Sequence, residues 1–443
     1  MTEPPSDAQS GVTMADVKIA ALNAGSSGVG PGVLRDALIA HRLTGIEIAL
    51  VDESEDVVFP LADIGRRIAA KSGVPAKLAA YTDPAAALDG AAFVILAPDS
   101  GQRARATVDR ETIRRHDPAH LITDTGGVAG LAASLREVNR ADALCAAIKR
   151  HCPSARLINV GGPVQRTCAA AHQAGVKTVG VSAASLRAYK TIWETFHDEP
   201  IEHPFDDAVH AYDLLMAGIG GLSFVLELWE YETGEDLYPR LRERLAAGRD
   251  AGQSTSARVL AETGYLPASG DECVRGFVVP SVDGPTYAAS DSEADHRRWV
   301  TALAEMASGR RPWDALLAQA SWERPTDLVA AITLGKPMTM SALNLVNAGQ
   351  VPQLPAGTFV ETPATVDGAG PVATPLALPD AVVPMLARAC ELSAAIVAAA
   401  RSRSRYALDK ILEADPSVTN VPLANRALDE ILAANEDVVG RFE

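Results

Sequence analysis

The sequence predicts an α/β protein: a Rossmann-type parallel sheet followed by a helix-rich α+β region. The first observation is a series of short apolar runs between residues 16 and 184, separated by helix-length segments. Apolar strands that alternate with helices are typical of a parallel sheet covered on both faces. The second is a glycine-rich turn directly after the first run, and the third is a more helical pattern from residue 185 onward. We therefore expect one domain at 16–184 and another at 185–443.

Each expected element has a local signal. The expected strands are the apolar runs Val17–Leu22, Ile46–Val51, Ala92–Ala97, Leu121–Thr123, Arg156–Val160 and Lys177–Val181. Segments between them, such as Asp142–His151, carry apolar residues at helical spacing. In the second region, Asp236–Gly248 and Asp380–Ile411 are expected helices, and the latter should break before Asp415. Pro- and Gly-rich stretches at 351–357 and 367–379 are expected loops.

Composition and charge exclude several classes of protein. The 443 residues carry 40 Lys and Arg against 56 Asp and Glu, and the net charge of −16 disfavours nucleic acid or an anionic membrane as the main partner. Five cysteines without a C-x-x-C spacing argue against a disulfide framework or zinc ribbon and fit a reducing compartment. No apolar run approaches the ~18 residues of a membrane span, and Met1–Thr13 lacks the blocks of a signal peptide. We expect a cytoplasmic enzyme with a small-molecule partner.

A glycine-rich loop, Asn23–Gly32, follows the first expected strand and precedes an expected helix at Arg35–Arg42. Glycines at such a turn let the backbone approach a pyrophosphate, whose charge lies at the helix N-terminus. Asp52 closes the second expected strand, where a carboxylate would bond a ribose diol and disfavour a 2′-phosphate. Asn23 stands where the tightest turn usually carries glycine, and asparagine tolerates left-handed geometry better than most residues. The pattern predicts NAD binding; the alternative is a glycine-rich turn without a ligand.

Short motifs recur along nearly the whole chain. They are Lys18-Ile with Gly25-Ser26, Leu50-Val-Asp52, Tyr81-Thr-Asp83, Asp124-Thr-Gly-Gly127 with Leu135-Arg136, Cys152-Pro-Ser-Ala-Arg-Leu-Ile-Asn159, Gly264-Tyr-Leu-Pro267 with Gly270-Asp271, Asn344–Pro355, and Phe359-Val-Glu361-Thr-Pro363. In these motifs the chain resembles the family 4 glycoside hydrolases, NAD-dependent glycosidases related in fold to malate and lactate dehydrogenases. The most specific match is Asn344–Pro363, which is similar to the family's N-x-x-N-x-G-x-I-x-x-L-P…V-E-x-P.

The resemblance implies a redox route to glycoside cleavage. NAD takes a hydride from sugar C3, a base removes the acidified C2 proton, and the C1 group leaves; water then adds and the hydride returns. In the family a divalent metal, usually manganese, holds the C2 and C3 oxygens. Together with the loop pattern, the resemblance assigns NAD binding to Asn23, Gly25, Ser26, Ser27, Asp52, Asp83 and Asn159, and substrate binding to Asp124, Asn159, Asn347 and Arg275.

Asp271 is the expected catalytic base. A carboxylate beside sugar C2 in a partly desolvated site would have its pKa raised toward the working pH. The alternative is a loop aspartate that caps a turn after Gly270. Asn159 and Asn347 have an alternative of the same kind, as buried braces of their loops. Arg275 could bind a carboxylate or phosphate group on the substrate. The alternative is a surface arginine that contacts no substrate.

The sequence departs from the family at its metal site. Ser182 stands where the family has a metal-binding cysteine, and Gly221 where it has a metal-binding histidine. Gly162-Pro163 replaces the family's N-P motif, and Cys273 replaces the histidine of its D-x-H motif. A neutral hydroxyl cannot hold a divalent cation as a thiolate or an imidazole can. We therefore expect no manganese and no other metal.

The leading hypothesis is an NAD-dependent enzyme that acts on a sugar or glycoside by transient oxidation at C3 and elimination of the glycosidic bond, without the family's metal. Two alternatives stay open: a sugar dehydrogenase or epimerase, and a catalytically silent protein that binds sugar or NAD. We also expect a homodimer or homotetramer. The basis is the resemblance together with an apolar helix face at Leu392, Ile396 and Ala399.

Overall fold

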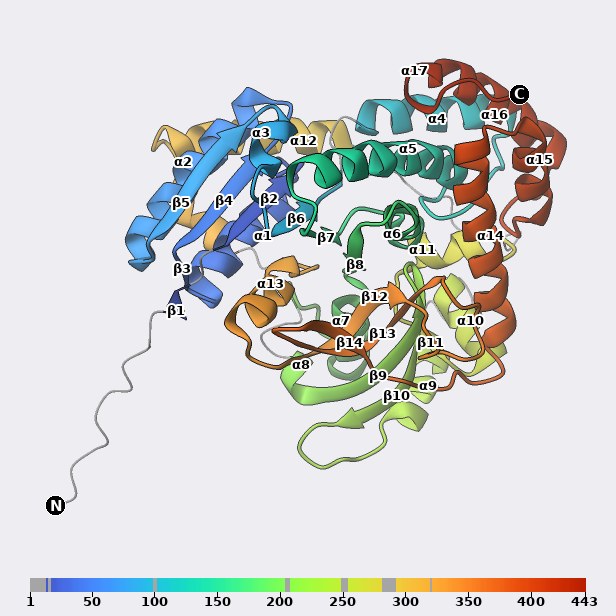
Figure 1. The fold of residues 1–443 in the computed structure, drawn as a ribbon. Helices are drawn as coiled ribbons and strands as arrows, with labels where there is room; N and C mark the ends of the chain where they lie inside the picture. The colour runs from blue at the N-terminus through green and yellow to red at the C-terminus, as the bar shows by residue number, and fades with distance from the viewer. Residues whose placement is uncertain are drawn as a thin grey trace.

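The structure, a computed structural model, describes residues 17–98, 102–203, 208–247, 254–280, 292–318 and 321–443, with the backbone of 13–14. Six parallel strands form its N-terminal part, in the order β5-β4-β2-β6-β7-β8. Their bounds are β2 Lys18–Leu22, β4 Ile46–Val51, β5 Ala76–Tyr81, β6 Phe93–Leu96, β7 Arg156–Asn159 and β8 Lys177–Gly180. The predicted parallel sheet is thus confirmed (Figure 1).

Two details of the strand prediction were wrong. The strand β5 was not expected. It pairs with β4 at the edge of the sheet, and most of its side chains are only partly buried. Residues Leu121–Thr123 form no strand. The hydroxyl of Thr123 instead accepts hydrogen bonds from the N–H groups of Thr125 (3.3 Å) and Gly126 (2.9 Å). This segment therefore turns locally, because a side chain satisfies backbone donors that a strand would leave to its neighbour.

The second region extends the same sheet with antiparallel strands. They are β9 Tyr212–Ile219, β10 Leu222–Glu230, β11 Leu266–Pro267, β12 Met338–Val346, β13 Phe359–Asp367 and β14 Gly370–Ala373. The two regions of the sheet are joined where Asn344 of β12 pairs with Gly180 of β8. Within the second region, Glu361 of β13 pairs with Gly218 of β9. One sheet of twelve strands therefore runs across residue 184 in the described residues, and the division into domains at that residue stays a prediction.

Helices cover the sheet and extend beyond it. The N-terminal ones are α1 Val29–Arg35, α2 Glu55–Ser72, α3 Pro84–Leu88, α4 Gln102–His116, α5 Gly127–His151, α6 Val164–Gln173 and α7 Ala184–His197. The others are α8 Ala208–Ala211, α9 Tyr238–Ala247, α10 Thr255–Thr263, α11 Asp271–Val274, α12 Ser292–Ala307, α13 Pro325–Leu334, α14 Val383–Ser402, α15 Arg405–Ala414, α16 Val421–Ala434 and α17 Glu436–Val439. Short helical turns lie at Asp36–Ala40, Arg275–Phe277 and Trp313–Ala318, and a two-stranded pair joins β1 Thr13–Met14 to β3 Leu43–Thr44.

The expected boundaries in the second region were partly right. The helix expected at 236–248 is α9, and the one expected at 380–411 divides into α14 and α15. The division occurs at Arg403, whose φ of 52° ends α14 in left-handed geometry. The loop expected at 367–379 contains β14, which pairs with β13 across a turn at Asp367–Gly370. The first helix begins at Val29, earlier than expected.

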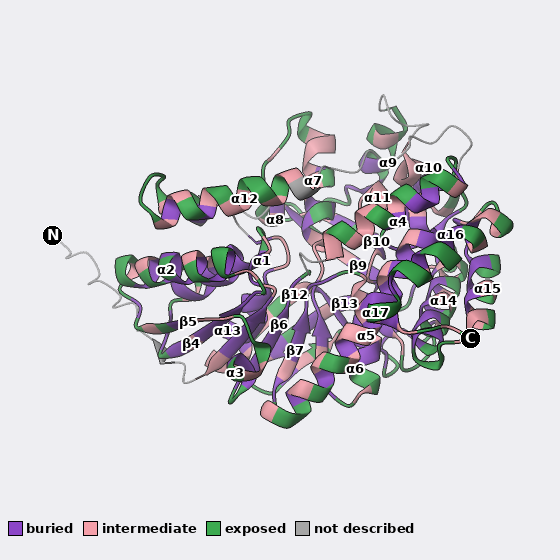
Figure 2. Cartoon of the chain, turned by 90° about the horizontal axis from the view of Figure 1, so that it is seen from above, coloured by how far each residue is buried: buried purple, intermediate pink, exposed green. Residues whose placement is uncertain are grey.

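Elements of the second region pack on both flanks of the parallel sheet. α12 lies against α2, and Leu303 and Leu328 join the buried core of the N-terminal strands. On the other flank, α14 and α16 pack against α5 and α4 (Figure 1). Figure 2 shows buried residues concentrated in the sheet and on the helix faces turned toward it. The two regions therefore share their hydrophobic cores.

One helix of the described residues, α14, is long and apolar enough to cross a membrane by length and composition alone. In the structure it packs against α5, α6 and α15, and its Ile396 and Ala399 are at most 2% exposed. Leu392 is half-buried beside them in the same cluster. The face that predicted an oligomer is thus covered within the chain, so it no longer supports that prediction, and an oligomer stays a prediction from the resemblance alone.

Candidate functional site

The first part of the candidate site is the loop between β2 and α1. Asn23 adopts left-handed geometry with a φ of 56°, and its Nδ2 donates to the carbonyl oxygen of Ala97 at 2.8 Å. The amide therefore ties the loop to the end of β6, which a glycine at this position could not do. Ser26 is half-buried and Ser27 is exposed, and both lie in the turn that leads into α1.

Glycines set how closely this loop packs. A Cβ on Gly25 would lie 2.5 Å from Asp52 Oδ2, and one on Gly30 would lie 1.9 Å from the carbonyl oxygen of Ala24. Around Gly28, by contrast, nothing lies within 4 Å of the position that a Cβ would take. The loop is therefore closely packed on its inner side and open at the N-terminus of α1, where the backbone N–H groups of a first turn favour an anion.

Asp52 braces this loop from the end of β4. It is 5% exposed, its Oδ2 accepts the Gly25 N–H at 2.9 Å, and its Oδ1 accepts the Ser54 N–H at 3.1 Å. Two acceptor positions of the carboxylate remain for a ribose diol, so that role stays a prediction. From the other side, Trp299 of α12 donates its indole N–H to the Gly25 carbonyl oxygen at 2.8 Å. Sequence reasoning missed Trp299, because it lies 274 residues away from Gly25.

Two predicted cofactor residues have local structural partners. Asp83 is exposed and caps α3 by accepting the Ala85 N–H at 3.0 Å. Asn159 is fully buried at the end of β7 and bonds Gly161 twice: its Nδ2 donates to the carbonyl oxygen, and its Oδ1 accepts the N–H. The structure therefore supports the brace alternative for Asn159, and contact of either residue with NAD stays a prediction.

The second part of the site surrounds Glu361 of β13, a residue that the sequence motif contains but to which no role was assigned. The side chain is fully buried. Its Oε1 accepts hydrogen bonds from Ser182 Oγ at 2.5 Å and Asn344 Nδ2 at 2.8 Å, and its Oε2 lies 2.5 Å from Ser223 Oγ. Burial raises the pKa of Glu361, while the three hydrogen bonds oppose that rise.

This network can hold Glu361 in either protonation state. The Ser223 hydroxyl also lies 3.1 Å from the carbonyl oxygen of Ile219. When Glu361 is ionised, Ser223 donates to its Oε2. When Glu361 is protonated on Oε1, it donates to Ser182 and Ser223 still donates to Oε2; when it is protonated on Oε2, it donates to Ser223, which then donates to the carbonyl oxygen of Ile219. The carboxyl oxygens of Glu361 and the Ser223 hydroxyl keep a partner in each arrangement, so neither protonation state leaves these groups unsatisfied. The arrangement suits a carboxyl group that gains and loses a proton.

Ser182 connects this buried network to a cavity. It follows β8 and is one of the residues that line a cavity of about 190 Å³. The lining also includes Tyr189, Trp322 and Glu323, and burial raises the pKa of the Glu323 carboxyl. Glu361 therefore lies behind a hydroxyl that reaches this cavity, at the edge of the sheet where β2 and the glycine loop also end.

Asp124 lies in the turn between α4 and α5. Thr125, the next residue, donates its hydroxyl to the Cys273 carbonyl oxygen at 2.8 Å, and a Cβ on Gly221 would lie 3.3 Å from Thr125 Cγ2. Asp124 is exposed, yet the protein around it reduces its hydration and raises its pKa; Arg110 opposes that rise, and Glu272 adds to it. The structure therefore brings Asp124 to the strand-end region that also contains Gly221.

Arg166 of α6 forms hydrogen bonds that hold the turn containing Asp124 and Thr125. It is 5% exposed, its Nη2 donates to the Thr125 carbonyl oxygen at 2.6 Å, and its Nη1 donates to Ser134 Oγ at 2.6 Å. Burial lowers the pKa of Arg166 to about 10. The sequence contained no signal for this residue, since its partners come from a different helix and from a carbonyl group.

The expectation for Asp271 was wrong in the direction of its pKa. Its carboxylate accepts hydrogen bonds from the Thr255 N–H (2.8 Å), the Ser256 N–H (2.8 Å) and the hydroxyls of Ser254 (3.0 Å) and Ser256 (2.6 Å). Burial acts to raise the pKa, but these donors outweigh it and lower the pKa. Asp271 thus caps the N-terminus of α10. The capping alternative is therefore nearly right, except that it placed the capped backbone in the turn after Gly270.

Arg275 and Asn347 also have structural partners. Arg275 lies 3.5 Å from Asp271 through Nη2 and donates from Nε to Thr255 Oγ1 at 3.2 Å. Asn347 is 2% exposed, and its amide bonds both ends of its own loop, including the carbonyl oxygens of Val351 and Leu354 at 2.9 Å. Asn347 is therefore a loop brace, and substrate contact at either residue stays a prediction.

The residues at the family's metal position do not fit a divalent cation. The Ser182 hydroxyl is bonded to Glu361, and Gly221 has no side chain. Across the part of the chain that the structure describes, no three His, Cys, Asp or Glu side chains come together in a way that could hold a metal ion. Neutral hydroxyl and amide groups around one buried carboxylate are weak substitutes for thiolate and imidazole ligands.

Comparisons with known proteins agree with this architecture. Among solved structures, a 6-phospho-alpha-glucosidase from gut microorganisms in complex with NAD and Mn²⁺ matches with a TM-score of 0.81 at 16% identity, over 96% of this chain and all of the other. A 6-phospho-beta-glucosidase from Thermotoga maritima matches with a TM-score of 0.76 at 17% identity, over 96% and 100%. These likenesses confirm the fold, a Rossmann-type sheet followed by a helix-rich region.

Sequence comparison identifies the family. An alpha-glucosidase of Erwinia rhapontici is 26% identical over 391 residues, which are 80% of this chain and 83% of that protein. An alpha-galactosidase of Bacillus subtilis is 23% identical over 377 residues, 79% and 81% of the two chains. The models of the family 4 glycosyl hydrolases match residues 18–195, and 216–418 for their C-terminal domain. The chain belongs to the family 4 glycosyl hydrolases.

Proposed function

We propose that this protein is an NAD-dependent glycosidase that works without a metal ion. Membership of the family and the names of its glucosidase and galactosidase relatives support the glycosidase part. The observation that supports the metal-free part is that Ser182, which the resemblance aligns with the family's metal-binding cysteine, is bonded to the buried Glu361 and lines the cavity beside the strand ends. The fit of the loop at Asn23–Gly28 supports NAD as the cofactor.

The residues of this loop would hold the cofactor in a defined way. The open N-terminus of α1 at Gly28 would receive the pyrophosphate, and Asp52 would accept hydrogen bonds from a ribose diol. A carboxylate at that position repels a 2′-phosphate, so NAD is preferred over NADP. Bound NAD supplies a hydride acceptor for oxidation of a sugar C–H.

Ser182 and Glu361 take the proton of the sugar hydroxyl that is oxidised. As that O–H proton moves to Ser182 Oγ, the serine proton moves to Glu361 Oε1, and the negative charge of the carboxylate is neutralised. The distance of 2.5 Å between Ser182 Oγ and Glu361 Oε1 allows this transfer without movement of either side chain. The reverse sequence returns the proton when the sugar carbonyl is reduced again, so the pair is unchanged at the end of a cycle.

Asp124 is the carboxylate that we propose for abstraction of the C2 proton. Its pKa is raised, which suits a general base, whereas that of Asp271 is lowered by its donors. Asp124 is also exposed to solvent, so its proton can exchange with water between turnovers. The C1 group then leaves by elimination and takes up a proton from solvent, water adds at C1 and releases a proton to solvent, and Asp124 returns a proton to C2 from the same face.

A panel of aryl glycosides tests the reaction class. Both anomers, with plain, phosphorylated and uronic sugars, should be incubated with the protein and NAD in deuterated water. We expect release of the aryl group, deuterium at C2 of the sugar product and no net reduction of NAD. Accumulation of reduced cofactor with a free sugar would instead identify a dehydrogenase, and NAD binding without turnover on any glycoside would identify a silent binding protein.

Metal analysis tests the finer part of the proposal. Purified protein should be measured for bound manganese, and its glycosidase activity compared before and after EDTA treatment. We expect substoichiometric metal and unchanged activity. Stoichiometric manganese whose removal abolishes turnover would overturn the metal-free mechanism while leaving the glycosidase assignment intact.

A further inference from the structure

A second cavity, of about 630 Å³, lies at the opposite edge of the sheet from the candidate site. It is lined by residues from the first positions of β7 and β8, from the end of β12, and from β14. Its polar lining contains Arg156, Lys177 and His172, and none of its lining residues is acidic. In a chain with a net charge of −16, a cavity without a carboxylate stands apart from the average surface.

Arg156 is the central cation of this cavity. It is half-buried, and within the described residues no hydrogen bond or ion pair holds its guanidinium. A Cβ on Gly370 would lie 2.7 Å from Arg156 Nη2, so the glycine leaves room for the guanidinium beside β14. Burial lowers the pKa of Arg156, and no neighbouring carboxylate opposes that shift. The guanidinium is therefore partly dehydrated without a compensating anion, which costs free energy.

Lys177 adds a second uncompensated charge. Arg156 of β7 and Lys177 of β8 are directly paired in the parallel register. Like charges on adjacent strands destabilise a sheet. Lys177 is exposed and, among the described residues, has no ion-pair partner either. Two neighbouring cations that face one cavity would both be stabilised by a single bound anion.

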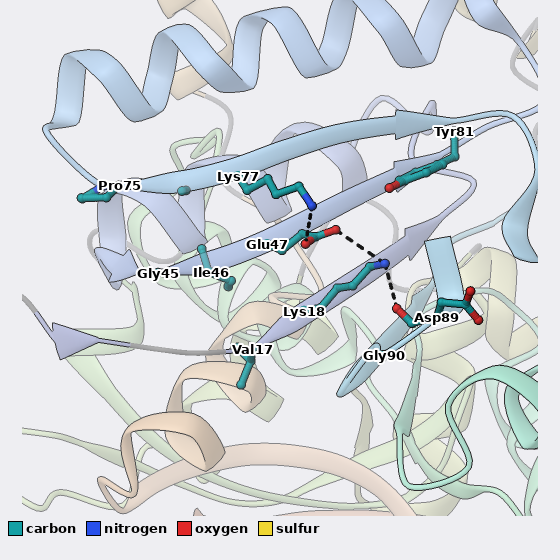
Figure 3. Close-up of a pocket in the computed structure, with 11 residues that line it drawn as sticks. Val17, Lys18, Gly45, Ile46, Glu47, Pro75, Lys77, Tyr81, Asp89 and Gly90 are labelled. Atoms are coloured by element: carbon teal, nitrogen blue, oxygen red, sulfur yellow. Dashed lines mark hydrogen bonds and ion pairs between the residues drawn. The ribbon is translucent and has the colours of Figure 1, made fainter. Parts of the chain in front are cut away.

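The same sheet offers a direct contrast near the starts of β2, β4 and β5. There Lys18, Glu47 and Lys77 are paired in register, so that the charges alternate. Glu47 lies 3.5 Å from Lys18 Nζ and 2.8 Å from Lys77 Nζ, and Figure 3 shows these three side chains pointing toward one another. Lys18, Glu47 and Lys77 line a pocket of their own, and Glu47 compensates its two cations, whereas no carboxylate lines the Arg156 cavity.

We propose that the Arg156 cavity is a binding site for a small oxyanion, a phosphate or carboxylate group, separate from the glycosidase site. The guanidinium of Arg156 would bind two oxygens of the anion side by side, and the ammonium group of Lys177 would add a point charge. The ligand is either a free inorganic ion or the charged group of a small metabolite, because both present the same oxygens. The site lies at the N-terminal edge of β7 and β8, and the glycoside would bind at their C-terminal edge.

Lysine labelling tests this site without reference to turnover. The full-length protein should be treated with an amine-acylating reagent, with and without inorganic phosphate, and the labelling rate of each lysine followed by peptide mass spectrometry. We expect millimolar phosphate to slow acylation of Lys177 by about tenfold. Lys77 serves as the internal control, because it is exposed at the equivalent strand edge but already paired with Glu47; its rate should not change.

Substitution identifies the anchoring group. Arg156→Met keeps the apolar stem and removes the guanidinium, so it should abolish the protection of Lys177 while the melting temperature stays equal or rises. The control Lys77→Met should leave that protection intact. Parallel titrations with acetate and with a phosphorylated sugar distinguish the sources: equal protection by free phosphate and the sugar phosphate indicates a site for the ion itself, and stronger protection by the sugar phosphate indicates a metabolite site.

Three outcomes would overturn the proposal. The first is no protection of Lys177 by any of these anions, and the second is equal protection of Lys77, which would reflect ionic strength. The third is protection of Lys177 in the absence of added anion that disappears on dilution together with a fall in molecular mass, because an acidic side chain of a second copy would then fill the cavity.

Discussion

Two strand ends of the same sheet have diverged to different degrees. The loop after β2 keeps a close-packed glycine turn, with Gly25 against Asp52 and an open N-terminus at Gly28. After β8, Ser182 stands where the resemblance places a metal-binding cysteine, and its hydroxyl is bonded to the buried Glu361. The loop after β2 thus keeps the packing of a cofactor loop, whereas the strand end after β8 presents a hydroxyl–carboxyl pair.

If no metal ion binds after β8, the chemistry of the sugar oxygens there must differ from that of the family. A metal ion stabilises negative charge on substrate oxygens, whereas a carboxyl–hydroxyl pair can only move a proton. In the proposed mechanism the proton therefore leaves the sugar hydroxyl through Ser182, and the burial that raises the pKa of Glu361 favours its protonated carboxyl as the product of that transfer. The following experiments break or sharpen this contrast between the two strand ends.

Glu361→Gln should have the largest effect. The amide keeps the shape of the carboxyl and donates to Ser223 as protonated Glu361 would, but it cannot accept a proton. We expect kcat of the glycosidase reaction to fall by about a thousandfold or more. In the wild-type protein, the raised pKa of Glu361 should place the acid limb of the kcat profile above the ordinary range of a glutamate. Steady-state kinetics across pH measure both quantities, and a variant with near-normal kcat would remove Glu361 from the mechanism.

Gly25→Ala and Gly28→Ala should separate packing from ligand contact at the other strand end. The first places a Cβ 2.5 Å from Asp52 Oδ2, so it should lower the melting temperature and weaken NAD binding by tenfold or more, on the order of 1.4 kcal/mol. The second meets open space, so it should leave the melting temperature unchanged and weaken NAD binding by about tenfold through the pyrophosphate alone. Calorimetry measures the NAD affinity of each variant, and thermal unfolding measures its melting temperature. Unchanged affinity in Gly28→Ala, or tighter binding of NADP than of NAD by the wild type, would contradict the loop assignment.

The same Glu361→Gln variant should have a smaller effect of opposite sign on stability. Because the folded-state pKa of Glu361 is raised, the stability that its protonated form contributes is lost as the pH rises through that pKa. Glutamine mimics the protonated form at every pH. The variant should therefore match the wild type in acid and become the more stable of the two at mildly alkaline pH, as followed by melting temperature. A variant that is less stable throughout the range would show that the ionised carboxylate is the favoured state.

Asp271→Asn should have the smallest effect on turnover. Its carboxylate caps α10, so its loss should cost about 1 kcal/mol of folding free energy. Since its lowered pKa contributes stability that is lost as the pH falls through that value, the deficit of the variant should shrink in acid. We expect kcat to fall by less than about tenfold. A thousandfold loss with an unchanged melting temperature would restore Asp271 as the base in place of Asp124.

Local pattern was sufficient for much of the fold and for the loop after β2. Short apolar runs separated by helix-length segments predicted the parallel strands, because burial on both faces leaves little choice of side chain. The same reasoning predicted Asn23, Gly25 and Asp52 as one group, and they do lie together. Tertiary context overrode pattern at β5, where half-buried side chains resemble a surface segment, and at Leu121–Thr123, where a hydroxyl replaced strand pairing.

By itself, the sequence determined the fold class and the family, because both depend on the pattern of residues along the chain; the absence of a metal stays a prediction. Tertiary structure alone decided what each polar side chain does. Asp271 and Asn347 proved to have their hydrogen-bonding capacity largely used by neighbouring backbone and hydroxyl groups. Glu361 gained its place beside Ser182 from strands that are 179 residues apart in the chain. A pKa and a free acceptor depend on burial and on partners from distant segments, and only the folded chain brings those partners together.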